Sequence, residues 1–300
     1  MTPNGGAYGE GNLFSLPAGG GTPTNLVSFG GTDGAYPAGS LTLSADGSTF
    51  YGMTNAGGLY GDGTIFSVPL TGGTPTTLLS FDGANGESPV RNLTLGGSTL
   101  YGMTPSGGAG QGTVFSISTD GSNFENLLAF SGTNGAGPQG SLTLSADGST
   151  LYGMTTGGGA NFEGVIFSIP AAGGAPTNLG TLDYATGANP YGNLTLVGST
   201  LYGLTHAGGA DGDGAIFSIP TSGGTPTNLF SLDYATNGSN PYGSLTLGGS
   251  TFYGMANGGG ADNYGTVLAL ALPTPEPSSL VLLGLDAIGL AAIVRRGRSR

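Results

Sequence analysis

An internal repeat of about 50 residues runs through most of the chain and restricts the folds open to it. The tripeptide Tyr-Gly-Met or Tyr-Gly-Leu recurs at spacings of 50, 51, 50 and 51 residues, beginning at Tyr51, Tyr101, Tyr152, Tyr202 and Tyr253. A Phe-Ser pair and a Leu-Thr-Leu segment recur with the same period, and a proline lies four residues before each Leu-Thr-Leu. Self-similarity at this period is typical of solenoids and propellers.

Each unit contains four short runs with the composition of β-strands. In residues 62–104 these runs are 63–69, 76–81, 92–95 and 98–104, and turns rich in Gly, Pro, Asp and Asn separate them. No helical spacing of apolar residues occurs before residue 275. The third turn differs by two residues between units, which keeps the following strand on the same face. The repeat region is therefore predicted to be all-β.

Four strands every 50 residues match the blade of a β-propeller; a parallel β-helix is the alternative, but its coils are usually shorter. We predict about five four-stranded blades and one extra strand at 266–272, with blades at 12–54, 63–104, 112–155, 164–205 and 214–256. Residues 1–6 align with residues 103–108, in the middle of a unit. We therefore expect a truncated N-terminus, with further strands and an export signal upstream.

Composition excludes several classes of protein. With 64 Gly and 18 Pro, a chain without a period would be disordered, so the repeat decides in favour of a fold. The absence of Cys excludes disulfides and cysteine nucleophiles. Residues 1–272 carry 15 acidic residues against Arg91 alone, and such a body repels nucleic acid. No nucleic-acid partner is expected.

The last 28 residues have a different character. Pro275, Glu276 and Pro277 precede an apolar stretch at 280–294, which is interrupted by Asp286, and Arg295, Arg296 and Arg298 follow. Fifteen helical residues span roughly 22 Å, less than the ~30 Å hydrocarbon core of a bilayer. We predict a repeat domain at 1–272 and an anchor segment with a short hydrophobic helix at 273–300.

Two resemblances follow from these motifs. The Thr-Leu-Tyr-Gly-Met-Thr and Gly-Thr-Ile-Phe-Ser-Val strings resemble the GloVer tandem repeats of bacterial surface proteins. The tail resembles a PEP-CTERM sorting signal, with Pro275, Glu276 and Pro277 as the motif and Arg295, Arg296 and Arg298 as the basic end. The second resemblance implies export, processing by an exosortase, transient contact with the inner membrane and a place at the cell surface, commonly beside secreted polysaccharide.

Two sets of repeated residues are candidate sites. A carboxylate recurs in the loop after the Tyr-Gly strand, and a ring of these loops is a candidate Ca²⁺ site: Glu10, Asp62, Glu163, Asp211 and Asp213. Ordinary turn chemistry is the alternative. The five repeated tyrosines are candidates for stacking on sugars, against the alternative that they pack between blades. His206 is the single histidine, and no partnered base and nucleophile identify a catalytic triad.

These observations predict an exported, surface-sorted repeat protein with a structural or ligand-binding role in the extracellular polysaccharide matrix. No enzymatic activity and no cofactor other than Ca²⁺ are expected. A polysaccharide-active enzyme on the same scaffold and a passive surface spacer are the alternatives.

Overall fold

The computed structural model describes residues 1–272, which contain 21 β-strands and no helix. The strands are β1 (Asn12–Ser15), β2 (Thr24–Ser28), β3 (Ala35–Leu43), β4 (Thr49–Ala56), β5 (Thr64–Pro69), β6 (Thr76–Ser80), β7 (Thr94–Gly96), β8 (Thr99–Thr104), β9 (Thr113–Ser118), β10 (Glu125–Ala129), β11 (Thr143–Leu144), β12 (Thr150–Met154), β13 (Val165–Pro170), β14 (Thr177–Thr181), β15 (Thr195–Val197), β16 (Thr200–Thr205), β17 (Ala215–Pro220), β18 (Thr227–Ser231), β19 (Thr246–Gly248), β20 (Thr251–Ala256) and β21 (Thr266–Ala271). The all-β prediction is confirmed. Within this part of the chain no helix can span a membrane; the predicted C-terminal helix lies outside the described residues.

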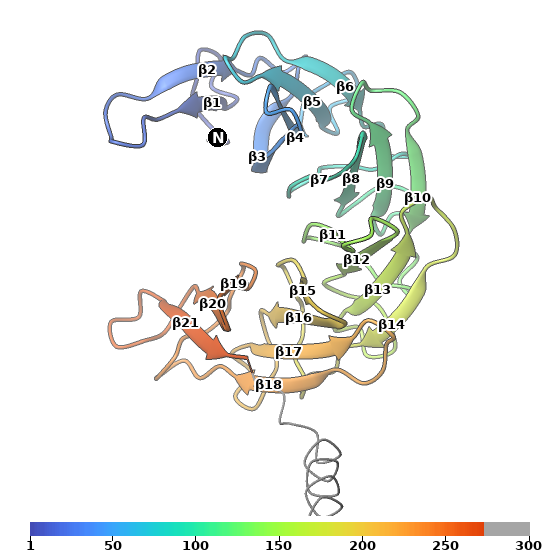
Figure 1. Ribbon diagram of the computed structural model, residues 1–300, viewed down its shortest axis with the longest axis vertical. Helices are drawn as coiled ribbons and strands as arrows, with labels where there is room; N and C mark the ends of the chain where they lie inside the picture. The colour runs from blue at the N-terminus through green and yellow to red at the C-terminus, as the bar shows by residue number, and fades with distance from the viewer. Residues whose placement is uncertain (273–300) are drawn as a thin grey trace, which may run out of the picture.

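The strands form six antiparallel sheets that follow one another around a common centre (Figure 1). We number these sheets as blades 1 to 6. Blade 1 contains β1 and β2, blade 6 contains β19 to β21, and each blade between them has four strands in chain order from the centre outwards. Figure 1 shows an opening between blades 1 and 6. The fold is propeller-like, and the ring of described residues is not closed.

The blade boundaries differ from those predicted, although the number of strands agrees. The predicted blade 63–104 contains β5 and β6 of blade 2 and β7 and β8 of blade 3. The Tyr-Gly strand pairs with the Phe-Ser strand that follows it, as in Gly52 opposite Phe66, whereas the chain after β6 crosses to the next blade. A period gives the length of a unit and not its starting point. The structure therefore has four complete and two partial blades, where five complete blades and one extra strand were predicted.

The hydrophobic core lies between neighbouring blades. Tyr51, Met53 and Ile65 of blade 2 pack with Leu100 and Phe115 of blade 3, and all five side chains are at most 7 % exposed. The same repeat positions form the next two interfaces, up to that between blades 4 and 5. Full burial of one such side chain contributes about 1.5–3 kcal/mol.

Hydrogen bonds between inner strands also join the blades, and we call this set the inner ladder. The hydroxyls of four equivalent threonines donate to a leucine carbonyl of the following blade at 2.6–2.7 Å: Thr42 to Leu93, Thr94 to Leu142, Thr143 to Leu194, and Thr195 to Leu245. Two residues before each of these threonines, a backbone N–H donates to a side-chain oxygen at the same repeat position in the following blade: Ser40 to Asn92, Asn92 to Ser141, Ser141 to Asn193, and Asn193 to Ser244. The ladder fixes the spacing between inner strands.

The two end blades expose side chains that are buried between neighbouring blades elsewhere in the repeat. Tyr253, Met255 and Val267 of blade 6 are 45 %, 66 % and 75 % exposed, whereas their equivalents in blade 2 are at most 7 % exposed. Phe14 and Leu16 of blade 1 are 36 % and 53 % exposed, and their blade 2 equivalents are fully buried. The difference arises because no blade in the described chain covers these faces.

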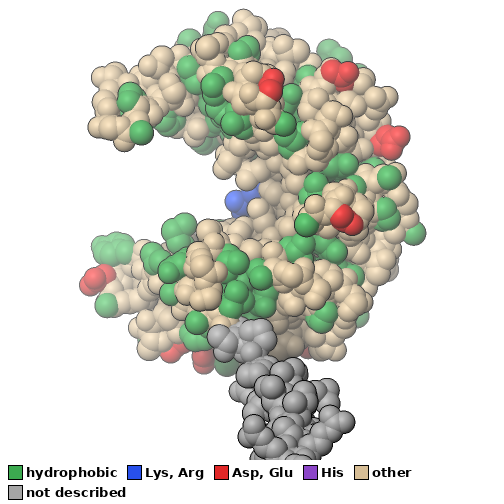
Figure 2. Space-filling view, viewed as in Figure 1, with side chains coloured by type: hydrophobic (Ala, Val, Ile, Leu, Met, Phe, Trp, Pro, Cys, Tyr) green, Lys and Arg blue, Asp and Glu red, His purple; other side chains and the backbone are tan. Residues whose placement is uncertain are grey.

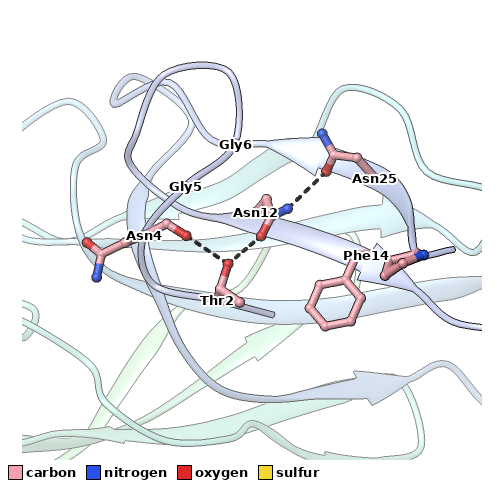
Figure 3. A pocket seen from close by; sticks show the side chains of 8 residues that line it. Thr2, Asn4, Gly5, Gly6, Asn12, Phe14 and Asn25 are labelled. Atoms are coloured by element: carbon pink, nitrogen blue, oxygen red, sulfur yellow. Dashed lines mark hydrogen bonds between the residues drawn. The ribbon is translucent and has the colours of Figure 1, made fainter.

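A pocket of about 340 Å³ opens beside Phe14 (Figure 3). Its polar groups largely satisfy one another: the Thr2 hydroxyl donates to the Asn4 carbonyl and bonds Asn12, and the Asn12 amide donates weakly to Asn25 at 3.5 Å. The pocket therefore belongs to the uncovered end of blade 1.

One hairpin turn makes a pH-dependent contribution to the stability of the folded chain. Hydrogen bonds from the Ser145 hydroxyl, and then from the Ser149 amide and hydroxyl, lower the pKa of Asp147 from 3.8 to about 2. Because the folded pKa is depressed, this stabilisation is complete above pH 3.8 and is lost as the pH falls through about 2. We expect the Asp147 carboxyl to titrate near pH 2 by NMR, and the Ser145→Ala variant to move it towards 3.8. A wild-type midpoint at 3.8 would contradict the turn geometry.

Candidate functional site

The structure does not bring the five repeated tyrosines together on one accessible surface. Tyr51, Tyr101 and Tyr152 are only 7–8 % exposed, between blades. Tyr202 is half-buried against Phe252, with ring centroids 4.6 Å apart, and Tyr253 lies on the exposed face of blade 6. In four of the five units the tyrosine therefore packs against the neighbouring blade.

The recurring acidic position has a main-chain role. Its carbonyl accepts a hydrogen bond from the residue before the next proline, as in Tyr36 to Glu10, Ser88 to Asp62, Asn189 to Glu163, and Asn240 to Asp213. Gln111 accepts the same bond from Gly137, so the carboxylate is not needed for it. In residues 1–272 no three Asp, Glu or His side chains are placed to hold a metal ion. The structure thus does not assemble the predicted Ca²⁺ site from Glu10, Asp62, Glu163, Asp211 and Asp213.

These hydrogen bonds hold the inner segments, which we define as the four residues from the proline to the serine or asparagine of the inner ladder. The residue before each proline has a positive φ of 51–59°: Tyr36, Ser88, Gly137, Asn189 and Asn240. A Cβ atom added to Gly140 would lie 2.2 Å from the Gly192 carbonyl oxygen, and one on Gly192 would lie 2.1 Å from that of Gly243. Neighbouring inner segments therefore stack directly on one another.

The inner segments also contain the clearest departures from the repeat. The third position is glycine in four segments and Arg91 in the segment before β7. The second position is Ala38, Val90 or Gln139 in three segments, and Tyr191 or Tyr242 in the last two. Residues that maintain the scaffold recur in every unit, so departures from the local rule are candidates for function.

Three of these departures lie close together with His206. We define the inner mouth as Arg91, Tyr191, His206 and Tyr242. The rings of Tyr191, His206 and Tyr242 form one cluster, with centroids 5.1, 4.6 and 5.0 Å apart. Arg91 donates from Nε to the Gln139 carbonyl at 2.7 Å and from Nη2 to the Tyr242 carbonyl at 3.4 Å. The second bond joins residues 151 positions apart.

The inner mouth combines aromatic surface with one positive charge. Tyr242 is 47 % exposed, Tyr191, His206 and Arg91 are half-buried, and the His206 Nδ1 atom is buried without a partner. Burial lowers the pKa of Arg91, and no carboxylate offsets that effect. Figure 2 shows basic atoms at the hollowed inner side and acidic groups over the outer surface.

A shallow pocket of about 270 Å³ extends the inner mouth along blade 6. It is lined by Tyr242, Gly243, Met255, Ala256, Asn257 and Tyr264. Asn257 occupies the repeat position of His206, and Tyr264 is 92 % exposed. A concave, mostly apolar surface with a few polar groups is the usual form of a small-ligand site.

Sequence comparison decides the family. Residues 1–150 and 110–283 match the Gloeobacter/Verrucomicrobia repeat in two overlapping copies. The chain belongs to the Gloeobacter/Verrucomicrobia repeat family. Residues 273–299 of this repeat protein match the PEP-CTERM protein-sorting motif, which confirms the predicted signal. The repeat protein is thus exported and sorted to the cell surface through its C-terminus, and the motif implies recognition by an exosortase. No curated protein sequence matches the chain.

Solved structures share the fold of the repeat protein. A putative 6-phosphogluconolactonase from Bacteroides uniformis has a TM-score of 0.57 and 17 % identity, with 92 % of this chain and 78 % of that chain covered. An oligogalacturonate lyase in complex with manganese has a TM-score of 0.56 and 12 % identity, with 87 % of this chain and 72 % of that chain covered. A chain of a nidogen/laminin complex has a TM-score of 0.53 and 18 % identity, with 83 % of this chain and 80 % of that chain covered. At these identities the likeness shows the fold alone.

The comparisons correct one prediction. The repeat protein was predicted to have no enzymatic activity, but its fold is shared with a putative lactonase and a lyase. The absence of a recognisable triad therefore does not classify the repeat protein as a non-enzyme, and its enzymatic status is not established.

Proposed function

We propose that the repeat protein binds a carbohydrate of the extracellular polysaccharide matrix at the inner mouth. The observation that supports this proposal is the cluster of three rings formed by Tyr191, His206 and Tyr242, of which Tyr242 also lines the shallow pocket along blade 6. The location of the protein agrees with a binding partner outside the cell, because the sorting motif directs the protein to the cell surface.

The chemistry of the cluster favours a sugar. Tyrosine offers a flat apolar ring that packs against the C–H face of a pyranose and a hydroxyl that hydrogen-bonds its polar edge. Both tyrosines lie on inner segments that stack on their neighbours and continue into the inner ladder, so their positions are set before a ligand arrives. A preorganised site loses less conformational entropy on binding.

Calorimetric titration of the full chain with extracellular polysaccharide from its host tests the proposal. We expect saturable heat, and an affinity at least about 10-fold lower for Tyr242→Gln, which introduces the residue found at Gln139. Tyr60→Ala is the matched control, because Tyr60 is 60 % exposed and outside the inner mouth. Equal loss in both variants, or no heat from the folded wild type, would overturn the proposal. The polymer is sized afterwards, and a shortened polymer would replace simple binding by catalysis.

A further inference from the structure

Arg91 is a half-buried cation without an anion. It is the only Lys or Arg in residues 1–272, and burial is the sole cause that lowers its pKa, so no described carboxylate compensates its charge. Removing a charge from water without a compensating partner is costly. The other four inner segments stack with glycine at this position, so the ring does not require a guanidinium there.

The hydrogen bonds of Arg91 leave part of its guanidinium free. A guanidinium carries five N–H donors, and only Nε and one hydrogen of Nη2 are used, by the carbonyls of Gln139 and Tyr242. These two bonds hold the planar group in place beside the segment that carries the Tyr242 ring. The remaining donors form a fork that matches the two oxygens of a carboxylate.

We propose that the inner mouth recognises a carboxylate-bearing sugar, a uronate unit, with Arg91 on the carboxylate and the Tyr242 ring against the sugar. This inference rests on the proposed function and adds the chemical class of the ligand. The 15 acidic residues of the body repel polyanions at long range, so the recognition is of one carboxylate at short range. At 0.1 M salt the distant charges are screened beyond about 10 Å, whereas the partly buried contact persists.

The test uses the full chain, a galacturonate tetramer and its neutral methyl ester, titrated calorimetrically in 0.1 M salt. We expect the wild type to prefer the acid, and Arg91→Gln to lower its affinity for the acid roughly 10- to 100-fold, so that the preference disappears. Arg91→Lys keeps the charge without the planar fork and should give an intermediate preference. The melting temperature of Arg91→Gln should stay within roughly 2 °C of the wild type, because its side chain mainly contacts two carbonyls.

Two results would overturn the inference: equal wild-type affinity for the acid and its ester, or Arg91→Gln losing affinity for both together with a clear fall in melting temperature. The second would make Arg91 a structural link between inner segments. If the host polysaccharide binds while the galacturonate preference is absent, only the uronate assignment fails. If a folded protein binds no polysaccharide, the proposed function itself fails.

Discussion

Replacing Gly102 by alanine is expected to destabilise the protein by about 1–3 kcal/mol or more, the cost of forcing extra atoms into a packed core. Gly102 lies opposite Phe115 in the pairing of β8 with β9, and the phenyl ring covers it. An added Cβ would be 2.3 Å from Cζ of Phe115. The ring is fully buried and packs edge-to-face on Phe81 at 5.4 Å, so it has little room to move. Urea denaturation measures the loss.

Gly254→Ala is the matched control for this substitution. Gly254 holds the same repeat position in blade 6, but its cross-strand partner is Leu268 instead of phenylalanine. The nearest atom to an added Cβ is then 3.3 Å away, at the flexible end of Leu245. We expect a change within about 0.5 kcal/mol. Equal losses in the two variants would show that strand conformation, rather than the phenyl ring, requires the glycine.

Met103→Ala is expected to cost about 2–5 kcal/mol, whereas Met255→Ala should cost less than about 0.5 kcal/mol. The two methionines share one repeat position, but Met103 is 3 % exposed between blades 3 and 4 and Met255 is 66 % exposed. Truncating the first leaves a cavity, while truncating the second removes solvated surface. Urea denaturation of both variants makes the comparison.

The result for Met255 also tests the end of the ring. A loss of several kcal/mol on truncating Met255 would mean that something covers the exposed face of blade 6 in the folded protein. Gel filtration of the same variant would then show whether that cover is a second copy, because loss of an oligomer would accompany the loss of stability.

The motif after residue 273 predicted the sorting tail, and the repeat predicted the all-β class and the number of strands. The repeat did not predict the blade boundaries, because β4 pairs with β5 through a hairpin while β6 and β7 belong to different sheets. Recurrence alone made the repeated tyrosines and acids candidate site residues. Tyr51 is buried between blades, and the carbonyls of Glu10 and Gln111 accept the same main-chain hydrogen bond in their units.

The inner mouth had a signal in the sequence that recurrence could not reveal. Arg91, Tyr191 and Tyr242 stand at two adjacent positions after the repeated prolines, where other units have glycine or a smaller or uncharged residue. Comparing the units for departures would have singled them out. Their meeting could not be foreseen, because it depends on how the inner segments stack around the centre and on a contact between residues 91 and 242.

The inner ladder and the blade interfaces join each blade only to its neighbours, and this arrangement determines how the protein responds to tension. Apart from the Arg91–Tyr242 hydrogen bond, which joins the segments before β7 and β19, a force applied between blades 1 and 6 of the described chain passes through the interfaces in series, and the weakest one yields first. Each blade that detaches and unravels releases about 50 residues, or roughly 170 Å of chain at ~3.4 Å per residue. A surface protein of this construction would lengthen in steps and spread a sudden load over several ruptures, with its remaining blades intact.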